Sequence, residues 1–184
     1  MTKGEIAILC GSSGSGKTTA LLHLLEYLIP AAPVCRGILC PPVFQEDSKI
    51  GIDLLDVSNR KTARLAEVNQ TSETSLATHG WKLDPQTVHM GNEILRHSVP
   101  CDLLFVDELG PLEYERGEGL MEGFPAINSR NYQLAFVTIR PSLLSAALNC
   151  WPNALVYDVN VADQNALIRR LSELVKLKTN FSQP

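Results

Sequence analysis

Eight consecutive residues near the N-terminus, Gly11–Thr18, have the types and spacing of a phosphate-binding loop. They read Gly-Ser-Ser-Gly-Ser-Gly-Lys-Thr and fit the pattern G-x-x-x-x-G-K-[ST]. Glycines let such a loop turn tightly, so that backbone N–H groups point at the phosphates; Lys17 would reach the β- and γ-phosphates, and the Thr18 hydroxyl a bound Mg²⁺. A helix starting near Lys17 would add the positive end of its dipole. The predicted phosphate site comprises Gly11, Ser12, Ser13, Gly14, Ser15, Gly16, Lys17, Thr18 and Thr19.

A pair of acids, Asp107 and Glu108, follows the apolar run Leu103–Val106 and is the second candidate for chemistry. A buried strand would bring Asp107 to the carboxyl edge of a sheet, beside the phosphate loop, where its carboxylate can hold Mg²⁺ directly or through water. In P-loop ATPases, a glutamate at the position of Glu108 commonly orients and deprotonates the attacking water. Two solvated acids at a strand end are the alternative, and the phosphate loop upstream favours catalysis.

Two arginines and one further acid are additional candidates. Arg140 follows the apolar segment Leu134–Ile139, and at the same sheet edge it would stabilise charge on the transferring phosphoryl group. The alternative for Arg140 is a surface ion pair at the start of a helix. Arg116 could play the same part from the loop after Glu113, and Glu113 itself could position water or pair with an arginine.

Alternating strands and helices must position these residues. Strands are expected over 6–10, 102–107, 134–139 and 154–157, and helices after the phosphate loop as far as Pro30, from Pro85 behind a capping Asp84, and over 120–127, 141–149 and 162–178. This alternation predicts an α/β fold with a mainly parallel sheet flanked by helices. The segment of roughly 35–68 is typical of two or three antiparallel strands that extend the sheet, and 69–80 and 110–119 are expected to be loops.

Composition limits the remaining possibilities. A chain of 184 residues is long enough for one α/β domain, which we expect to span 1–184. The net charge of −4 does not favour nucleic acid as a partner. No apolar run has the length of a membrane span and no secretory signal is recognised, so we expect no membrane association and a cytoplasmic location. Five cysteines without metal-ligand spacing argue against a disulfide framework or a zinc site.

The stretch Asp107–Glu113, Asp-Glu-Leu-Gly-Pro-Leu-Glu, resembles the Asp-Glu-Ile-Gly-x-(Met/Leu)-Glu segment of the small P-loop nucleoside-triphosphatases. This is the family of the human cancer-related nucleoside triphosphatase and its thermophile homologues. The resemblance includes the phosphate loop, a loose match of Gly51–Leu54 to a Gly-Phe-x-(Leu/Val) segment, and Val137–Pro141. In order and spacing it therefore covers most of the chain.

The resemblance implies a RecA-like core with an extra antiparallel edge. It also implies slow, Mg²⁺-dependent hydrolysis of ATP, GTP and other nucleoside triphosphates to diphosphates, with Asp107 at the metal and Glu108 as catalytic base. The sequence departs from the family at two places. Ile52 stands where an aromatic residue is usual, which bears on stacking of the base, and Gly-Pro-Leu replaces Gly-Lys-Met in the acid motif, which bears on loop shape.

Two other functions stay open. A small-molecule or nucleotide kinase shares the phosphate loop, although the chain has no arginine-dense run typical of a kinase lid. A nucleotide-gated adaptor that uses slow hydrolysis as a timer would require an unidentified protein partner. A transporter ATPase subunit is disfavoured because no Leu-Ser-Gly-Gly-Gln-like signature is present. No Asn-Lys-x-Asp motif is present either, so loose base selection is expected.

Overall fold

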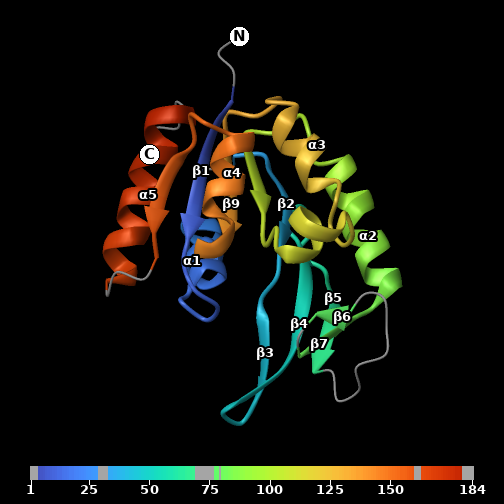
Figure 1. Ribbon diagram of the computed structural model, residues 1–184. Helices are drawn as coiled ribbons and strands as arrows, with labels where there is room; N and C mark the ends of the chain where they lie inside the picture. The colour runs from blue at the N-terminus through green and yellow to red at the C-terminus, as the bar shows by residue number, and fades with distance from the viewer. Residues whose placement is uncertain (1–3, 29–32, 69–76, 79, 160–162, 180–184) are drawn as a thin grey trace.

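Strand β1 (Glu5–Cys10) is an apolar run that is buried on both faces. The computed structural model describes residues 4–28, 33–68, 77–78, 80–159 and 163–179. Because side chains alternate along a strand, Ile6 and Ile8 belong to one apolar cluster, and Ala7 and Leu9 to a second on the opposite face. The sheet therefore lies between two layers of helices (Figure 1).

Five parallel strands form the centre of the sheet. In order across the sheet they are β10 (Leu155–Asp158), β1, β9 (Leu134–Ile139), β8 (Leu103–Val106) and β2 (Cys35–Leu39). Since parallel strands end at the same edge, the segments that follow β1, β9 and β8 meet there. This confirms the prediction of a mainly parallel α/β sheet.

An antiparallel extension continues the sheet beyond β2. It consists of β3 (Pro42–Gln45), β4 (Ser48–Asp56), β5 (Thr62–Val68), β6 (Ala77–Thr78) and β7 (Trp81–Leu83), with β4 paired to β2. The predicted antiparallel segment of roughly 35–68 is corrected at both ends. Residues 35–38 pair in parallel with β8, because α1 returns the chain to the start of the sheet before β2 begins, and only 38–39 pair antiparallel with β4. Strand β7 adds an antiparallel strand after 68.

The helices cover the sheet in two groups. They are α1 (Lys17–Leu28), α2 (Pro85–Arg96), α3 (Gly123–Asn128), α4 (Leu144–Cys150) and α5 (Gln164–Thr179), with a 3₁₀ turn, η3 (Pro141–Leu143), before α4. Helices α1 and α5 pack on one face, and α2, α3 and α4 on the other. The predicted loop 110–119 contains a π-helical turn, η2 (Leu112–Arg116). Most of the predicted loop 69–80 lies outside the described residues.

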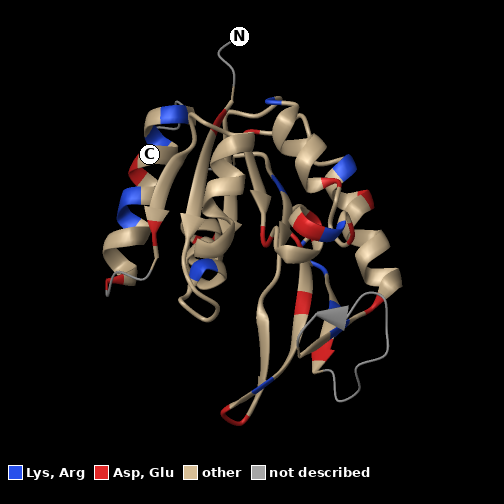
Figure 2. Cartoon of the chain, viewed as in Figure 1, with Lys and Arg blue, Asp and Glu red and all other residues tan. Residues whose placement is uncertain are grey.

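The surface charges are mixed in sign. Figure 2 shows basic and acidic positions interspersed with uncharged ones along α2 and α5. None of the described helices is long and apolar enough to cross a membrane. All five cysteines are free.

The start of α2 is set by its capping residue. The Asp84 carboxylate accepts hydrogen bonds from the Thr87 backbone N–H (2.8 Å) and the Thr87 hydroxyl (2.7 Å), and Pro85 occupies the first turn. These hydrogen bonds lower the pKa of Asp84. The helix start predicted at Asp84-Pro85 is confirmed.

We expect Asp84→Ala to lower the urea midpoint of unfolding at neutral pH, because the first turn of α2 loses an acceptor for its backbone N–H groups. Asp84→Asn should keep most of the stability, since asparagine also caps. A carboxyl whose folded pKa is lowered stabilises above its unfolded pKa, and this contribution is lost as the pH falls through the folded pKa. The gap between wild type and Asp84→Ala should therefore narrow in acid. Equal midpoints at neutral pH would contradict the capping role.

Candidate active site

The phosphate loop joins β1 to α1 at the carboxyl edge of the sheet. Gly14 (φ 76°) and Gly16 (φ 94°) adopt left-handed backbone conformations that side chains disfavour, which accounts for glycine at both positions. Lys17 is buried, and its Nζ donates to the backbone carbonyls of Gly11 (2.8 Å) and Ser12 (2.9 Å). The Lys17 ammonium is therefore bound by backbone carbonyls of the phosphate loop itself.

Helix α5 supports the loop from the side. The Gln164 side-chain amide, at the first residue of α5, donates to the Ser15 carbonyl at 3.1 Å. A Cβ atom on Gly16 would lie 2.6 Å from Gln164 Nε2, so a larger residue there would displace the Gln164 amide from the loop. The sequence analysis did not identify Gln164, because a contact between residues so far apart in the chain leaves no local pattern.

Asp107 is the buried centre of the site. It is 1% exposed, and its carboxylate accepts hydrogen bonds from the Thr138 hydroxyl (2.5 Å) on β9 and from the Cys40 backbone N–H (2.9 Å) after β2. Thr18 also donates a side-chain hydrogen bond to it. Burial raises the pKa of Asp107, and the three hydrogen bonds oppose that rise. The structure thus brings together the two predicted metal-binding residues, Thr18 and Asp107.

Glu108 and Arg140 form an ion pair at the entrance to the site. Arg140 follows β9 directly, and its Nε donates to Glu108 Oε1 at 2.5 Å. Glu108 is 24% exposed and Arg140 is 44% exposed. The structure therefore places the candidate base and the candidate cation in contact, at the same sheet edge as the phosphate loop.

Arg116 does not have the position considered for it, and Glu113 lines the cavity without the arginine partner considered for it. Glu113 pairs with backbone, not arginine: its two oxygens accept from the N–H groups of Gly110 (2.8 Å) and Leu120 (2.8 Å). Burial is the main cause of its raised pKa. Arg116 pairs with Glu118 at 2.7 Å and does not line the cavity described below. Glu113 therefore fixes the shape of the loop after Asp107, and Arg116 lies outside the site.

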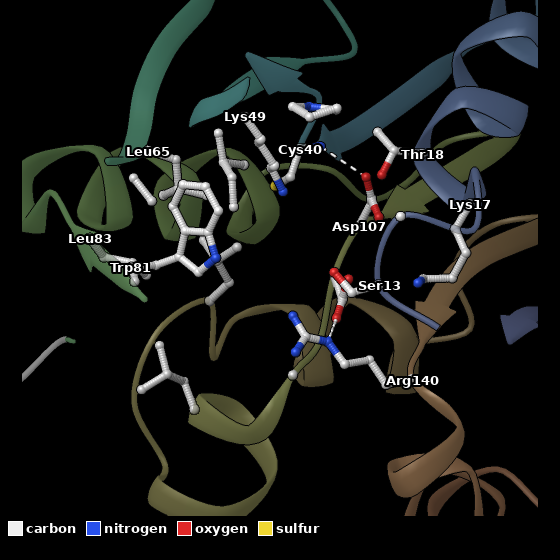
Figure 3. A pocket seen from close by; sticks show the side chains of 18 of the residues that line it. Ser13, Lys17, Thr18, Cys40, Lys49, Leu65, Trp81, Leu83, Asp107 and Arg140 are labelled. Carbon is white, nitrogen blue, oxygen red and sulfur yellow. Dashed lines mark hydrogen bonds and ion pairs between the residues drawn. The ribbon is translucent and has the colours of Figure 1, made fainter. Parts of the chain in front are cut away.

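One cavity of about 380 Å³ unites the site residues (Figure 3). Its polar end is formed by Lys17, Thr18, Asp107, Glu108 and Arg140. Its other end is walled by side chains of the antiparallel extension and of the segment after Glu108. These include Lys49, Ile52, Leu65, Trp81, Leu83, Pro111, Leu112 and Leu120.

The donor set at the polar end suits Mg²⁺. A hydroxyl from Thr18 and a carboxylate from Asp107 are hard oxygen ligands, which Mg²⁺ prefers. Among the described residues, no group of three or more His, Cys, Asp or Glu side chains could hold a metal alone. Two protein oxygens fit an ion that completes its coordination with phosphate oxygens and water.

Thr138 is a site residue that the sequence motifs do not single out, since it belongs only to the segment Val137–Pro141 that resembles the family. A polar residue within the buried apolar strand Leu134–Ile139 is a usable signal, because a buried hydroxyl requires a hydrogen-bond partner. The cavity residues Lys49 and Trp81 gave no such signal. They belong to strands whose positions depend on long-range pairing.

The fold and the site together define a P-loop nucleotide-binding protein. A strand–loop–helix phosphate site lies beside an acidic strand end, and one strand, β9, separates β1 from β8. The chain belongs to the NTPase family, whose model matches residues 6–172.

Individual relatives agree with this assignment. The chain is 28% identical over 105 residues to nucleoside-triphosphatase THEP1 of Saccharolobus solfataricus, an alignment that covers 57% of this chain and 59% of the relative. It thus matches about three fifths of that relative's length. The fold is similar to the solution structure of a human cancer-related nucleoside triphosphatase (TM-score 0.69, 19% identity, 95% and 98% of the chains covered). It is also similar to the crystal structure of THEP1 from Aquifex aeolicus (TM-score 0.63, 14% identity, 93% and 99% covered).

We expect Thr138→Val to lower the free energy of unfolding by about 2 kcal/mol, because it removes a hydrogen bond to a buried carboxylate. In an Asp107→Asn background the same change should cost less, since no buried charge then depends on the hydroxyl. Denaturant unfolding of the four proteins in this double-mutant cycle measures the difference. Equal costs in both backgrounds would show that the charge of the carboxylate adds nothing to the Thr138 hydrogen bond.

Proposed function

We propose that the chain hydrolyses nucleoside 5′-triphosphates, including ATP and GTP, to diphosphate and phosphate, with Mg²⁺ as cofactor. The observation that carries this proposal is the placement of Asp107 and Glu108 in one cavity with Lys17 and Thr18. Membership of the NTPase family and the names of the THEP1 relatives support it. We further propose a single domain over 1–184 and, from the five free cysteines, a cytoplasmic location.

Binding of the triphosphate would rely on the loop and on the start of α1. Backbone N–H groups of Gly11–Thr19 and the Lys17 ammonium would receive the phosphates, at the positive end of the helix. The Lys17 charge now held by two backbone carbonyls would turn to phosphate oxygens, which are stronger acceptors. No residue of this group reads a base, which supports broad base specificity.

Thr18 and Asp107 would hold the Mg²⁺ ion. Bound there, the ion would supply positive charge that neutralises the phosphate oxygens of the nucleotide. Asp107 is suited to this role because each of its carboxylate oxygens accepts a hydrogen bond, one from the Thr138 hydroxyl and one from the Cys40 N–H. These two bonds fix the direction of the carboxylate.

Glu108 would orient the attacking water and accept its proton. In the structure its carboxylate is bonded to Arg140. When a γ-phosphate enters the cavity, its oxygens would compete for the guanidinium, so that Arg140 moves to the charge developing on the phosphoryl group and Glu108 becomes available to water. Transfer of Arg140 from Glu108 to the γ-phosphate would thus bring both residues into the reaction.

The direct test is phosphate release from ATP, GTP, CTP and UTP with Mg²⁺, with and without added nucleosides or monophosphates as acceptors. Slow release from all four that is independent of acceptors is expected. Transfer to an acceptor that outpaces release would instead identify a kinase, and nucleotide binding without release would indicate a switch that requires a partner.

Glu108→Gln should lower turnover by about 10²–10⁴-fold, because the amide cannot accept the proton, and should leave nucleotide affinity nearly unchanged. Lys17→Ala should abolish productive binding. Single-turnover phosphate release and equilibrium titration with a fluorescent nucleotide separate the two effects. Hydrolysis by Glu108→Gln at the wild-type rate would refute the assignment of the base.

Arg140→Ala should lower turnover by about 10²-fold with a modest change in nucleotide affinity, because its charge is needed mainly in the transition state. Arg116→Ala is the matched control, since Arg116 lies outside the cavity, and it should keep wild-type turnover. If the two variants were equally active, Arg140 would have no part in the reaction.

A further inference from the structure

Half of the active-site cavity has no role in the hydrolysis proposed above. Most of its wall consists of apolar and aromatic side chains, from Ile52, Leu65, Trp81, Leu83, Leu112 and Leu120, and its charged members are Lys49 and Glu113. Both Glu113 oxygens already accept hydrogen bonds from backbone N–H groups. Triphosphate oxygens, Mg²⁺ and an attacking water are all polar and gain nothing from such a wall. An apolar chamber with a few polar groups is characteristic of a site for a small organic molecule.

The chamber lies beyond the expected position of the γ-phosphate. Across the sheet, the phosphate loop follows β1, the acids follow β8, and the chamber wall comes from β4, β5 and β7 farther along. In Figure 3, Asp107 lies between Lys17 on one side and Trp81, Leu65 and Leu83 on the other. On the proposed function, the triphosphate runs from Glu108 back over the phosphate loop to the start of α1, so the ribose and base lie on the side away from this wall. Ile52 then lies beside the chamber and does not stack on the base, contrary to what the family resemblance had implied for its position. The nucleotide therefore leaves the chamber free.

Lys49 places a positive charge in this chamber. Its ammonium lies 4.7 Å from the centroid of the Trp81 ring, and the side chain extends from β4 toward Asp107 (Figure 3). No carboxylate of the described residues forms an ion pair with it. Desolvation lowers the pKa of Lys49, and the charge of Glu108 opposes that shift. A half-buried ammonium on an apolar wall is stabilised when an anionic group pairs with it.

We propose that this half of the cavity is a second ligand site, which binds a small aromatic molecule carrying one anionic group while a nucleotide occupies the phosphate loop. The ring of the ligand packs against Trp81, Leu65 and Leu83, and its anionic group pairs with Lys49. The inference goes beyond hydrolysis and rests on the proposed function only for the direction in which the nucleotide lies.

The test uses the full chain saturated with Mg²⁺ and a non-hydrolysable triphosphate analogue, with benzoate as the probe and benzamide as its neutral counterpart. Binding is followed through the two tryptophan indole N–H resonances in NMR spectra. Benzoate should bind saturably and shift the Trp81 resonance. The Trp151 resonance is an internal control, because that side chain is fully buried and donates to Asn128 at 2.8 Å.

Lys49→Met should weaken benzoate binding about tenfold, the value of one charge-assisted hydrogen bond, and leave benzamide binding unchanged. Lys82→Met is the matched control, since Lys82 neighbours Trp81 on β7 but is exposed and does not line the cavity. It should bind benzoate as wild type does.

Three results would overturn the proposal. They are the absence of saturable benzoate binding, benzoate binding that the nucleotide analogue abolishes, and equal benzoate affinity in Lys49→Met and wild type. None of these readouts requires turnover, so a protein that fails to hydrolyse any triphosphate can still bind benzoate. Retained benzoate binding by Glu108→Gln would separate the second site from the hydrolytic one.

Discussion

The buried carboxylate of Asp107 is the constraint on which the rest of the site depends. A charge removed from water is costly unless hydrogen bonds replace its hydration, and here the donors come from three different elements. Thr18 belongs to α1, Thr138 to β9 and the Cys40 N–H to the end of β2. Any shift of one of these elements relative to β8 would leave the carboxylate with an unmade bond. The arrangement of the sheet and the geometry of this carboxylate are thus maintained by the same interactions.

Two other charged groups at the polar end of the cavity also have partners within the protein. Lys17 is bonded to carbonyls of its own loop, and Glu108 to Arg140. Each of these bonds offers an exchangeable partner, as does the Thr18 bond to Asp107, whereas the bonds from Thr138 and the Cys40 N–H hold the carboxylate in place. The site therefore combines a rigid centre with two cations whose acceptors can change, which suits chemistry in which negative charge enters and moves.

Sequence reasoning succeeded where a local pattern carries the information. The phosphate loop, the acid pair after an apolar strand and the Asp84 cap are each determined within a few residues, and the apolar runs predicted most strands. It was incomplete where the structure is determined by pairing between segments that are distant in the chain. The parallel direction of β2 depends on the crossover through α1, and the contact of Gln164 with Ser15 joins opposite ends of the chain. Glu113 resembled a catalytic acid because nothing local reveals that backbone N–H groups would occupy both of its oxygens.

The cavity is built from two kinds of structure with different tolerance to change. The end that receives phosphate lies on parallel strands that are buried on both faces, so substitutions there disturb a packed interior. The opposite wall comes largely from half-buried antiparallel strands, where a side chain can be replaced with smaller cost to the framework. A substitution in the extension can consequently reshape one wall of the cavity while the phosphate loop and Asp107 keep their positions.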